Sequence, residues 1–125
     1  MTRPVSITSA AHFRDQVLGS AEPVVVDFTA AWCAPCRALA PVLAELAARH
    51  AGAVRVAVVD AEALPDVCQA YRVTSMPTLL AFDRGEPVAQ LVGYGGRARV
   101  DRLFQDLAQR DGGRTPISAR SASTE

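Results

Sequence analysis

Cysteine, net charge and long apolar runs are all scarce in this sequence. Three cysteines in 125 residues, an odd number, argue against the disulfide framework of a small secreted domain. Thirteen basic and thirteen acidic side chains give a formal net charge of zero, so the composition predicts neither nucleic acid nor an anionic membrane surface as a partner. No apolar run approaches the length of a membrane span, and residues 1–4 lack the apolar stretch of a signal peptide. We therefore expect a soluble protein of the reducing cytoplasm.

The hydrophobic content indicates one domain. Half of the 125 residues are hydrophobic, which suffices for a single packed core but not for two. We assign this domain to residues 1–110. Residues 111–125 are rich in serine, alanine and threonine, and we predict a disordered tail without a function of its own. We expect the protein to act as a monomer.

The most informative motif is a pair of cysteines, Cys33 and Cys36, directly after the apolar residues 24–28. Two thiols at this spacing reach each other across one tight turn, so they can close into a disulfide and reopen. Pro35 has the fixed φ of a first helical turn, which predicts that Cys33 lies at a helix N-terminus. The partial positive charge and free N–H groups there favour the thiolate over the thiol. The motif therefore predicts a nucleophilic cysteine with a resolving partner.

Two other interpretations of the cysteine pair are weaker. A structural zinc site needs four ligands, and beyond this pair the sequence offers only Cys68, His12 and His50, without a second CxxC or CxxH motif. A purely structural disulfide would restrain almost no chain entropy, because it would close a loop of only two residues. We therefore expect redox chemistry, with no metal and no cofactor other than the Cys33–Cys36 disulfide.

Strand and helix patterns alternate along the domain. Apolar and β-branched runs predict strands at residues 5–7, 24–29, 54–60, 78–82 and 88–92. Helical spacing predicts helices from Ser9 to Gly19, over residues 36–50 with a kink at Pro41, over 64–71, and around 100–107. The strand–helix–strand unit from 24 to 60 predicts parallel pairing through a right-handed crossover, and the last two strands predict a hairpin.

Taken in order, these motifs resemble the thioredoxin family over about residues 5–110. The resemblance depends on Val25-Val26-Asp27-Phe28, Trp32-Cys33-Ala34-Pro35-Cys36-Arg37, Pro41 in the next helix, Met76-Pro77-Thr78 opening a strand, and Gly93 after the last strand. It implies an α/β thioredoxin fold, a central mixed sheet of about five strands flanked by four helices. It also implies reduction of disulfides in client proteins, with regeneration by thioredoxin reductase.

Asp27 is the candidate for proton transfer. It lies within an apolar strand, where burial disfavours the charged form and should raise its pKa. The resemblance implies that Asp27 accepts the proton of the resolving thiol, Cys36, through a water, while Cys33 is the nucleophile. The alternative is a carboxylate that only caps a neighbouring helix or turn.

Pro77 is the second informative residue outside the cysteine pair. The resemblance implies a cis Met76–Pro77 peptide bond that packs against the Cys33–Cys36 loop and leaves the Met76 backbone free to pair with an extended client segment. The alternative is a trans proline that merely begins a strand. An uncharged substrate-binding patch is expected around the nucleophile, formed by Trp32, Ala34, Pro35, Met76, Pro77 and Gly93, with Tyr94 as a further candidate.

Three residues depart from the commonest family pattern. Ala34 replaces a glycine between the cysteines and stiffens the turn. Thr29 stands where many bacterial members have a second tryptophan. Val56 is placed where many have a lysine near the buried aspartate, and without that cation Asp27 should be harder to ionise.

Two other functions share most of these features. A disulfide oxidase or isomerase would run the same chemistry in another direction, and its redox potential would distinguish it. A redox-independent binding subunit of a partner enzyme would keep its activity when Cys33 and Cys36 are both replaced by serine.

Overall fold

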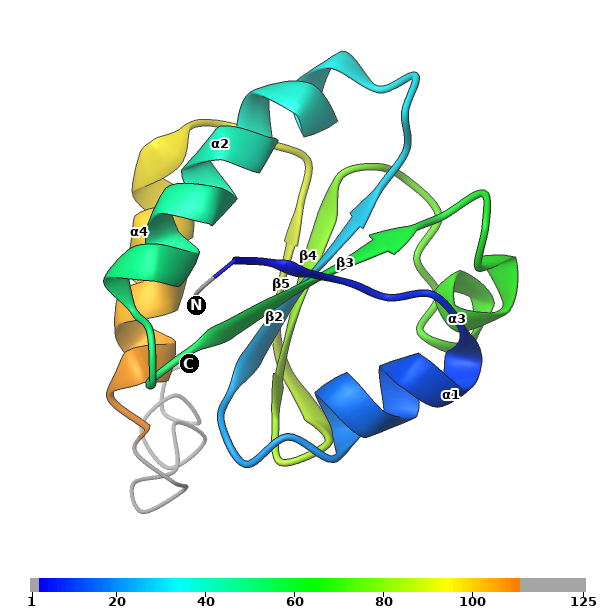
Figure 1. Ribbon diagram of the computed structural model, residues 1–125. Helices are drawn as coiled ribbons and strands as arrows, with labels where there is room; N and C mark the ends of the chain where they lie inside the picture. Colours follow the sequence, from blue (N-terminus) through cyan, green and yellow to red (C-terminus); the bar gives the residue numbers. More distant parts are fainter. Residues whose placement is uncertain (1–2, 111–125) are drawn as a thin grey trace.

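Five strands form one mixed sheet in the order β1-β3-β2-β4-β5. The computed structural model describes residues 3–110, and Figure 1 shows this sheet with helices on both faces. The strands are β1 (Val5–Ser6), β2 (Val24–Thr29), β3 (Arg55–Asp60), β4 (Thr78–Asp83) and β5 (Glu86–Val92). β3 pairs in parallel with both β1 and β2, whereas β4 is antiparallel to β2 and β5. The predicted parallel crossover and hairpin are both confirmed.

The helices form a layer on each face of the sheet. They are α1 (Ala10–Phe13), which continues into the π-helical stretch η1 (Arg14–Leu18), α2 (Ala34–Arg49), α3 (Pro65–Ala70) and α4 (Arg97–Ala108). In Figure 1, α2 and α4 cover one face, and α1 and α3 cover the other. Among the described residues the architecture is therefore the expected one, a mixed five-stranded sheet between helices. None of these helices is both long enough and apolar enough to cross a membrane.

The two cores follow from the alternation of side chains along β2. Val25 packs with the α2 and α4 residues, whereas Val24, Val26 and Phe28 pack with the α1 and α3 residues. Side chains two apart on a strand share a face, so Asp27 lies on the same face as Val25, beneath α2. The carboxyl group of Asp27, in a central strand, is thereby enclosed between the sheet and α2, the helix that follows this strand.

Most of the predicted elements are confirmed, with small shifts at their ends. Ser9 caps α1, since its Oγ accepts a hydrogen bond from the N–H of His12 at 3.0 Å. α2 begins two residues before the predicted start and continues through Pro41. The π-helical stretch was not expected, because π-helices have no distinctive local sequence signal. The predicted tail at residues 111–125 lies outside the described residues, so its disorder stays a prediction.

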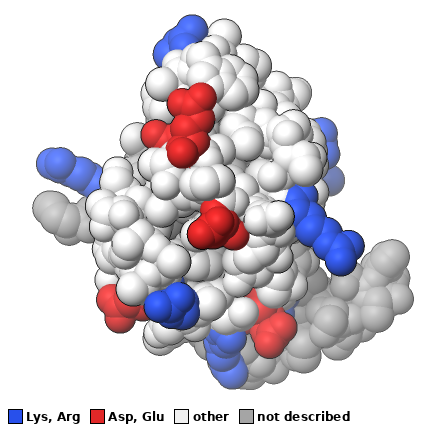
Figure 2. All heavy atoms as spheres, turned by 90° about the vertical axis from the view of Figure 1, so that its right-hand side faces the viewer, with Lys and Arg blue, Asp and Glu red and all other residues white. Residues whose placement is uncertain are grey.

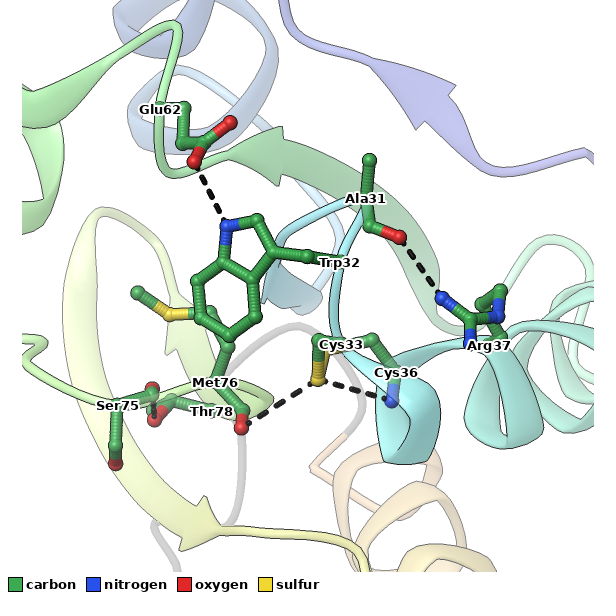
Figure 3. Close-up of a disulfide and its surroundings, with 9 residues drawn as sticks. All are labelled: Ala31, Trp32, Cys33, Cys36, Arg37, Glu62, Ser75, Met76 and Thr78. Atoms are coloured by element: carbon green, nitrogen blue, oxygen red, sulfur yellow. Dashed lines mark hydrogen bonds between the residues drawn. A yellow bond between two sulfur atoms is a disulfide. The ribbon is translucent and has the colours of Figure 1, made fainter.

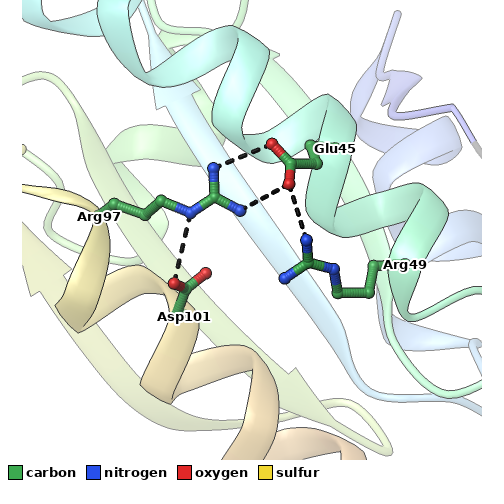
Figure 4. A network of polar contacts seen from close by, with 4 residues as sticks. All are labelled: Glu45, Arg49, Arg97 and Asp101. Carbon is green, nitrogen blue, oxygen red and sulfur yellow. Dashed lines mark hydrogen bonds and ion pairs between the residues drawn. The ribbon is translucent and has the colours of Figure 1, made fainter.

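An ion-pair network joins α2 to the start of α4 (Figure 4). Arg97 donates two hydrogen bonds to Glu45, at 2.9 and 2.8 Å, and a third to Asp101 at 3.3 Å. Arg49 also donates to Glu45 at 2.8 Å. The hydrogen bond from Arg97 is the largest cause of the lowered pKa of Glu45. These contacts hold the N-terminus of α4 on α2, close in sequence to Gly93.

Candidate active site

The two cysteines lie at the start of α2 and form a disulfide. Cys33 is the N-cap residue, with φ −99° and ψ 111°, and its Sγ accepts a hydrogen bond from the N–H of Cys36 at 3.2 Å. The N–H of Arg37 donates to the Cys33 carbonyl oxygen at 3.2 Å and continues the helix. Pro35 occupies the first turn, as the sequence predicts. The sulfur of residue 33 therefore lies where a helix N-terminus stabilises negative charge.

Met76 brings a second segment against the disulfide (Figure 3). The Met76–Pro77 peptide bond is cis, which confirms the expectation from the resemblance. The Met76 carbonyl oxygen lies 3.6 Å from the Sγ of Cys33, and its side chain packs against the cysteines and Ala30. The turn is held by Thr78, whose Oγ1 donates to the Ser75 carbonyl oxygen at 2.7 Å. A backbone carbonyl and a cis proline thus flank the sulfur.

The predicted patch residues around the disulfide differ in their exposure. Ala34 and Pro35 are exposed on the first turn of α2, whereas Met76 is half-buried and Pro77 is buried. Gly93 lies close by, because its N–H donates to the Pro77 carbonyl oxygen at 2.7 Å. Gly93 has φ +81°, and a Cβ added there would meet no atom within 4 Å. The residue keeps the surface beside Pro77 flat and its backbone in a conformation that favours glycine.

Trp32 extends from the loop before Cys33, with 67% of its surface exposed. Its Nε1–H donates to Oε2 of Glu62 at 2.7 Å (Figure 3). Sequence reasoning missed Glu62. The contact could have been inferred only from the strand pairing. Because β2 and β3 are parallel, the loops that follow them lie at the same edge of the sheet, and these loops contain Trp32 and Glu62.

The structure also shows the positions of Arg37, from the cysteine motif, and of Tyr94, the further candidate for the patch. Arg37 donates to the Ala31 carbonyl oxygen at 2.9 Å, which ties the first turn of α2 to the loop before Cys33 (Figure 3). Tyr94, a candidate for the patch, is half-buried and packs against the core between the sheet, α2 and α4. Trp32, Ala34, Pro35, Met76, Pro77 and Gly93 are the predicted patch residues that the structure brings around the disulfide.

Asp27 is buried beneath α2, with 3% of its surface exposed. Burial raises its pKa from 3.8 to about 7, in the predicted direction. Its Oδ1 accepts no hydrogen bond from the described part of the chain. A capping carboxylate would accept backbone N–H groups, so the structure does not support the alternative interpretation.

One expectation about the surroundings of Asp27 was wrong. The sequence predicted that Val56 occupies the position at which many family members have a lysine near the aspartate. In the sheet, however, Val56 pairs with Val25 and not with Asp27. The residue directly across from Asp27 on β3 is Val58. On the β4 side the partner is Leu79. Strand register decides such neighbours, and a shift of two positions keeps the same face, so sequence alternation alone does not separate Val56 from Val58.

The other candidate ligands lie apart from the site. Cys68 is buried in α3, in the core beneath α1 and α3, and burial raises the pKa of its thiol. His12 is exposed near the N-terminus, and His50 follows α2. Within residues 3–110, no three His, Cys, Asp or Glu side chains gather as a metal-binding group. The redox group in the described residues is the protein's own disulfide, between Cys33 and Cys36.

Comparison with known proteins agrees with this geometry. The family model described as thioredoxin matches residues 4–109. The chain belongs to the thioredoxin family. Thioredoxin of Mycobacterium tuberculosis is 41% identical over 103 residues, which cover 82% of this chain and 88% of that one. A structure of Malassezia sympodialis thioredoxin superposes with a TM-score of 0.79 at 26% identity, covering 86% of this chain and 93% of the other.

A longer relative contains the same domain beside a second activity. The bifunctional thioredoxin reductase/thioredoxin of Mycobacterium leprae is 40% identical over 103 residues, which cover 82% of this chain and only 22% of that protein. Members of the thioredoxin family are protein-disulfide reductases. The protein is accordingly a thiol–disulfide oxidoreductase that acts through the Cys33–Cys36 pair.

Proposed function

We propose that Cys33 is the attacking thiolate, Cys36 the resolving thiol and Asp27 the proton acceptor in the reduction of client disulfides. The observation that carries the assignment is the place of Cys33 at the N-cap of α2, beside the Met76 carbonyl oxygen. The helix N-terminus and the Cys36 N–H stabilise a thiolate on residue 33, whereas Cys36 lies inside the first turn of the helix. Both residues are buried, with 4% of the surface of Cys33 and 2% of that of Cys36 exposed.

The reaction transfers two electrons from the protein dithiol to the client disulfide. The Cys33 thiolate attacks one client sulfur, forms a mixed disulfide and releases the other client sulfur as a thiolate, which takes a proton from solvent. Cys36 then loses its proton and attacks the Sγ of Cys33. The mixed disulfide breaks, the second client thiol leaves, and the Cys33–Cys36 disulfide seen in the structure forms.

Asp27 is suited to take the proton in the second step. Its pKa of about 7 lets the carboxylate gain and lose a proton near neutral pH. It lies on the sheet face covered by α2, the helix that carries Cys36. A water between the carboxylate and the thiol would complete the transfer.

The client binds on the uncharged surface around the disulfide. An extended client segment pairs with the Met76 backbone beside Pro77, since a strand can add to free backbone groups. Trp32, Ala34, Pro35 and Gly93 then contact the residues that flank the client disulfide. A flat surface with few charged groups accepts many partners, which suits a general reductant.

Thioredoxin reductase is the proposed source of electrons for the oxidised protein. The Mycobacterium leprae relative supports this pairing, because it is a bifunctional thioredoxin reductase/thioredoxin. We propose that the protein works as a monomer in the cytoplasm.

A Cys36→Ser variant tests the assignment. The variant keeps the attacking thiolate but cannot resolve the mixed disulfide, so covalent adducts with a disulfide-containing protein should accumulate and disappear on adding dithiothreitol. Adducts are followed by non-reducing electrophoresis and mass spectrometry. Cys33→Ser is the matched control and should give none. Adducts on Cys36 in Cys33→Ser, and none in Cys36→Ser, would reverse the two roles.

A further inference from the structure

An apolar groove of about 630 Å³ leads away from the disulfide along α3. Its uncharged walls come from the residues after β3, from α3 and from the segment before Pro77, and they include Ala61, Pro65, Cys68, Val73 and Met76. Met76 also packs against Cys33 and Cys36, so this residue joins the groove to the disulfide. Figure 2 looks onto the side of the molecule that carries α1 and α3, where uncharged atoms predominate and charged side chains occur singly or in small groups.

Arg72 is the one charged residue among the described residues that line this groove. It follows Tyr71, the C-cap residue of α3, and has φ +59°, in the left-handed region that favours glycine or asparagine. Its N–H donates to the Gln69 carbonyl oxygen at 3.1 Å, and the next N–H, of Val73, donates to the Cys68 carbonyl oxygen at 2.9 Å. These hydrogen bonds fix the turn, so the fold requires this backbone conformation at residue 72. The fold does not require a long cationic side chain there.

The Arg72 side chain has no ion pair or hydrogen bond within the described part of the chain, unlike Arg49, Arg55, Arg97 and Arg110. It is exposed. A guanidinium binds a carboxylate through two parallel hydrogen bonds, and it is less strongly hydrated than an ammonium. Left-handed non-glycine residues cluster at ligand-binding sites, where a side chain is kept in spite of the backbone cost.

We propose that Arg72 is a specificity-determining residue that binds an aspartate or glutamate of the client segment lying in this groove. The proposal rests on the proposed attack of Cys33 on a client disulfide. Clients with a carboxylate within reach of Arg72 are reduced faster than otherwise identical neutral clients. The apolar walls hold the segment, and Arg72 selects its charge.

A set of disulfide-bonded peptides tests this role. Each peptide has one glutamate, at one to five residues on either side of the reactive cysteine, and is matched by peptides with glutamine or lysine there. Reduction by the dithiol form of the protein is followed by Trp32 fluorescence, and kcat/KM is compared. At low ionic strength, glutamate at the favoured position should raise kcat/KM roughly three- to fivefold over glutamine. The ratio should fall toward one in 0.5 M salt, since salt screens exposed charges.

Variants of Arg72 separate charge from structure. In Arg72→Gln, the glutamate and glutamine peptides should be reduced at equal rates, whereas Arg72→Lys should keep part of the preference. Arg72→Gly should lose the preference and yet unfold at a higher temperature than the wild-type protein, because glycine adopts the left-handed conformation without strain. Loss of specificity together with a gain in stability is not expected from damage to the fold.

Arg84 supplies the matched control. It is also a left-handed arginine, with φ +54°, but it lies in the β4–β5 turn, at the end of β4 away from Pro77. Arg84→Gln and Arg84→Gly should leave the peptide preference unchanged. Equal reduction of all peptides by the wild-type protein, or a preference that survives Arg72→Gln, would overturn the role of Arg72 alone. Failure of the wild-type protein to reduce any peptide would overturn the proposed function and this role with it.

Discussion

Two carboxylates are buried in the sheet, near opposite ends of β4. Asp27, paired in register with Leu79, has 3% of its surface exposed, and Asp83, at the far end of β4, has 7%. Asp83 forms a buried ion pair with Arg110, which lies just after α4. Asp27 has no charged partner among the described residues, although in both carboxylates the Oδ1 is buried without a hydrogen bond. The charge of Asp83 is balanced by Arg110, whereas burial of Asp27 favours its protonated form.

This difference decides what each carboxylate can do. A buried ion pair keeps both groups charged and can fix the end of a helix on a sheet, but it moves no proton. A buried carboxylate without a partner has a raised pKa, about 7 for Asp27, and so can exchange a proton at the pH of the cell. Asp27 lies near the disulfide end of the sheet, which fits the proton transfer that we propose for it.

The largest effect is expected from Asp27→Asn. Because folding raises the pKa of Asp27 from 3.8 to about 7, its burial favours the protonated form, and the free energy of unfolding falls as pH rises from about 4 through 7. Above pH 7 the loss is on the order of 4 kcal/mol, and Asp27→Asn should remove it. Urea unfolding at pH 4, 6 and 8 measures the effect. A difference between variant and wild type that does not grow with pH would show that Asp27 is ionised in the folded protein.

A somewhat smaller effect of opposite sign is expected from Arg110→Ala. Removing the guanidinium leaves Asp83 buried and charged without a partner, which should lower the free energy of unfolding by about 3 kcal/mol at pH 7. The rate of disulfide reduction should not change, since the pair lies at the end of the sheet away from Pro77. Asp83→Asn combined with Arg110→Ala should recover part of the loss, because no buried charge remains. An Arg110→Ala protein as stable as the wild type would contradict a structural role for the pair.

The smallest effect is expected from Val58→Lys, which gives Asp27 a partner of the kind that Asp83 has. Val58 is half-buried and directly across from Asp27, so an ammonium there should lower the pKa of Asp27 by roughly one unit, or about 1.4 kcal/mol. The pH profile of the resolving step should move to lower pH by the same amount, as measured by single-turnover reduction. Val58→Met is the uncharged control. A profile that moves equally in both variants would indicate packing and not charge.

The parts of the fold that the sequence predicted are those with strong local signals. Residues 24–29 are a β-branched, apolar run, and β2 has these bounds. The start of α2 followed from Pro35 within one turn, and the first helix was predicted to begin at Ser9, the residue that caps α1. These signals depend on the backbone preferences of residues that are neighbours in the sequence and on the pattern of apolar residues among them.

The candidate site was predictable where its residues form a motif and not where they meet across the sheet. Cys33 and Cys36 are three residues apart, and the cis bond before Pro77 followed from a resemblance of the whole chain. The Trp32–Glu62 hydrogen bond joins loops 30 residues apart and was missed. Val56 was chosen where the register places Val58. Such pairings depend on the register between strands. An alternating sequence pattern does not fix this register, because a shift of two residues keeps every side chain on the same face.

By itself, the sequence determined which sulfur chemistry is available and where the helix beneath it begins, because spacing, proline and β-branched runs act on the local chain. The tertiary structure alone decided which carboxylate keeps a proton and which arginine faces the groove. Asp27 and Asp83 both end up inside the sheet, and only the arrival of Arg110 from the end of α4 makes one of them an ion pair. Desolvation and charge neutralisation depend on neighbours in space, so neither can be deduced from position along the chain.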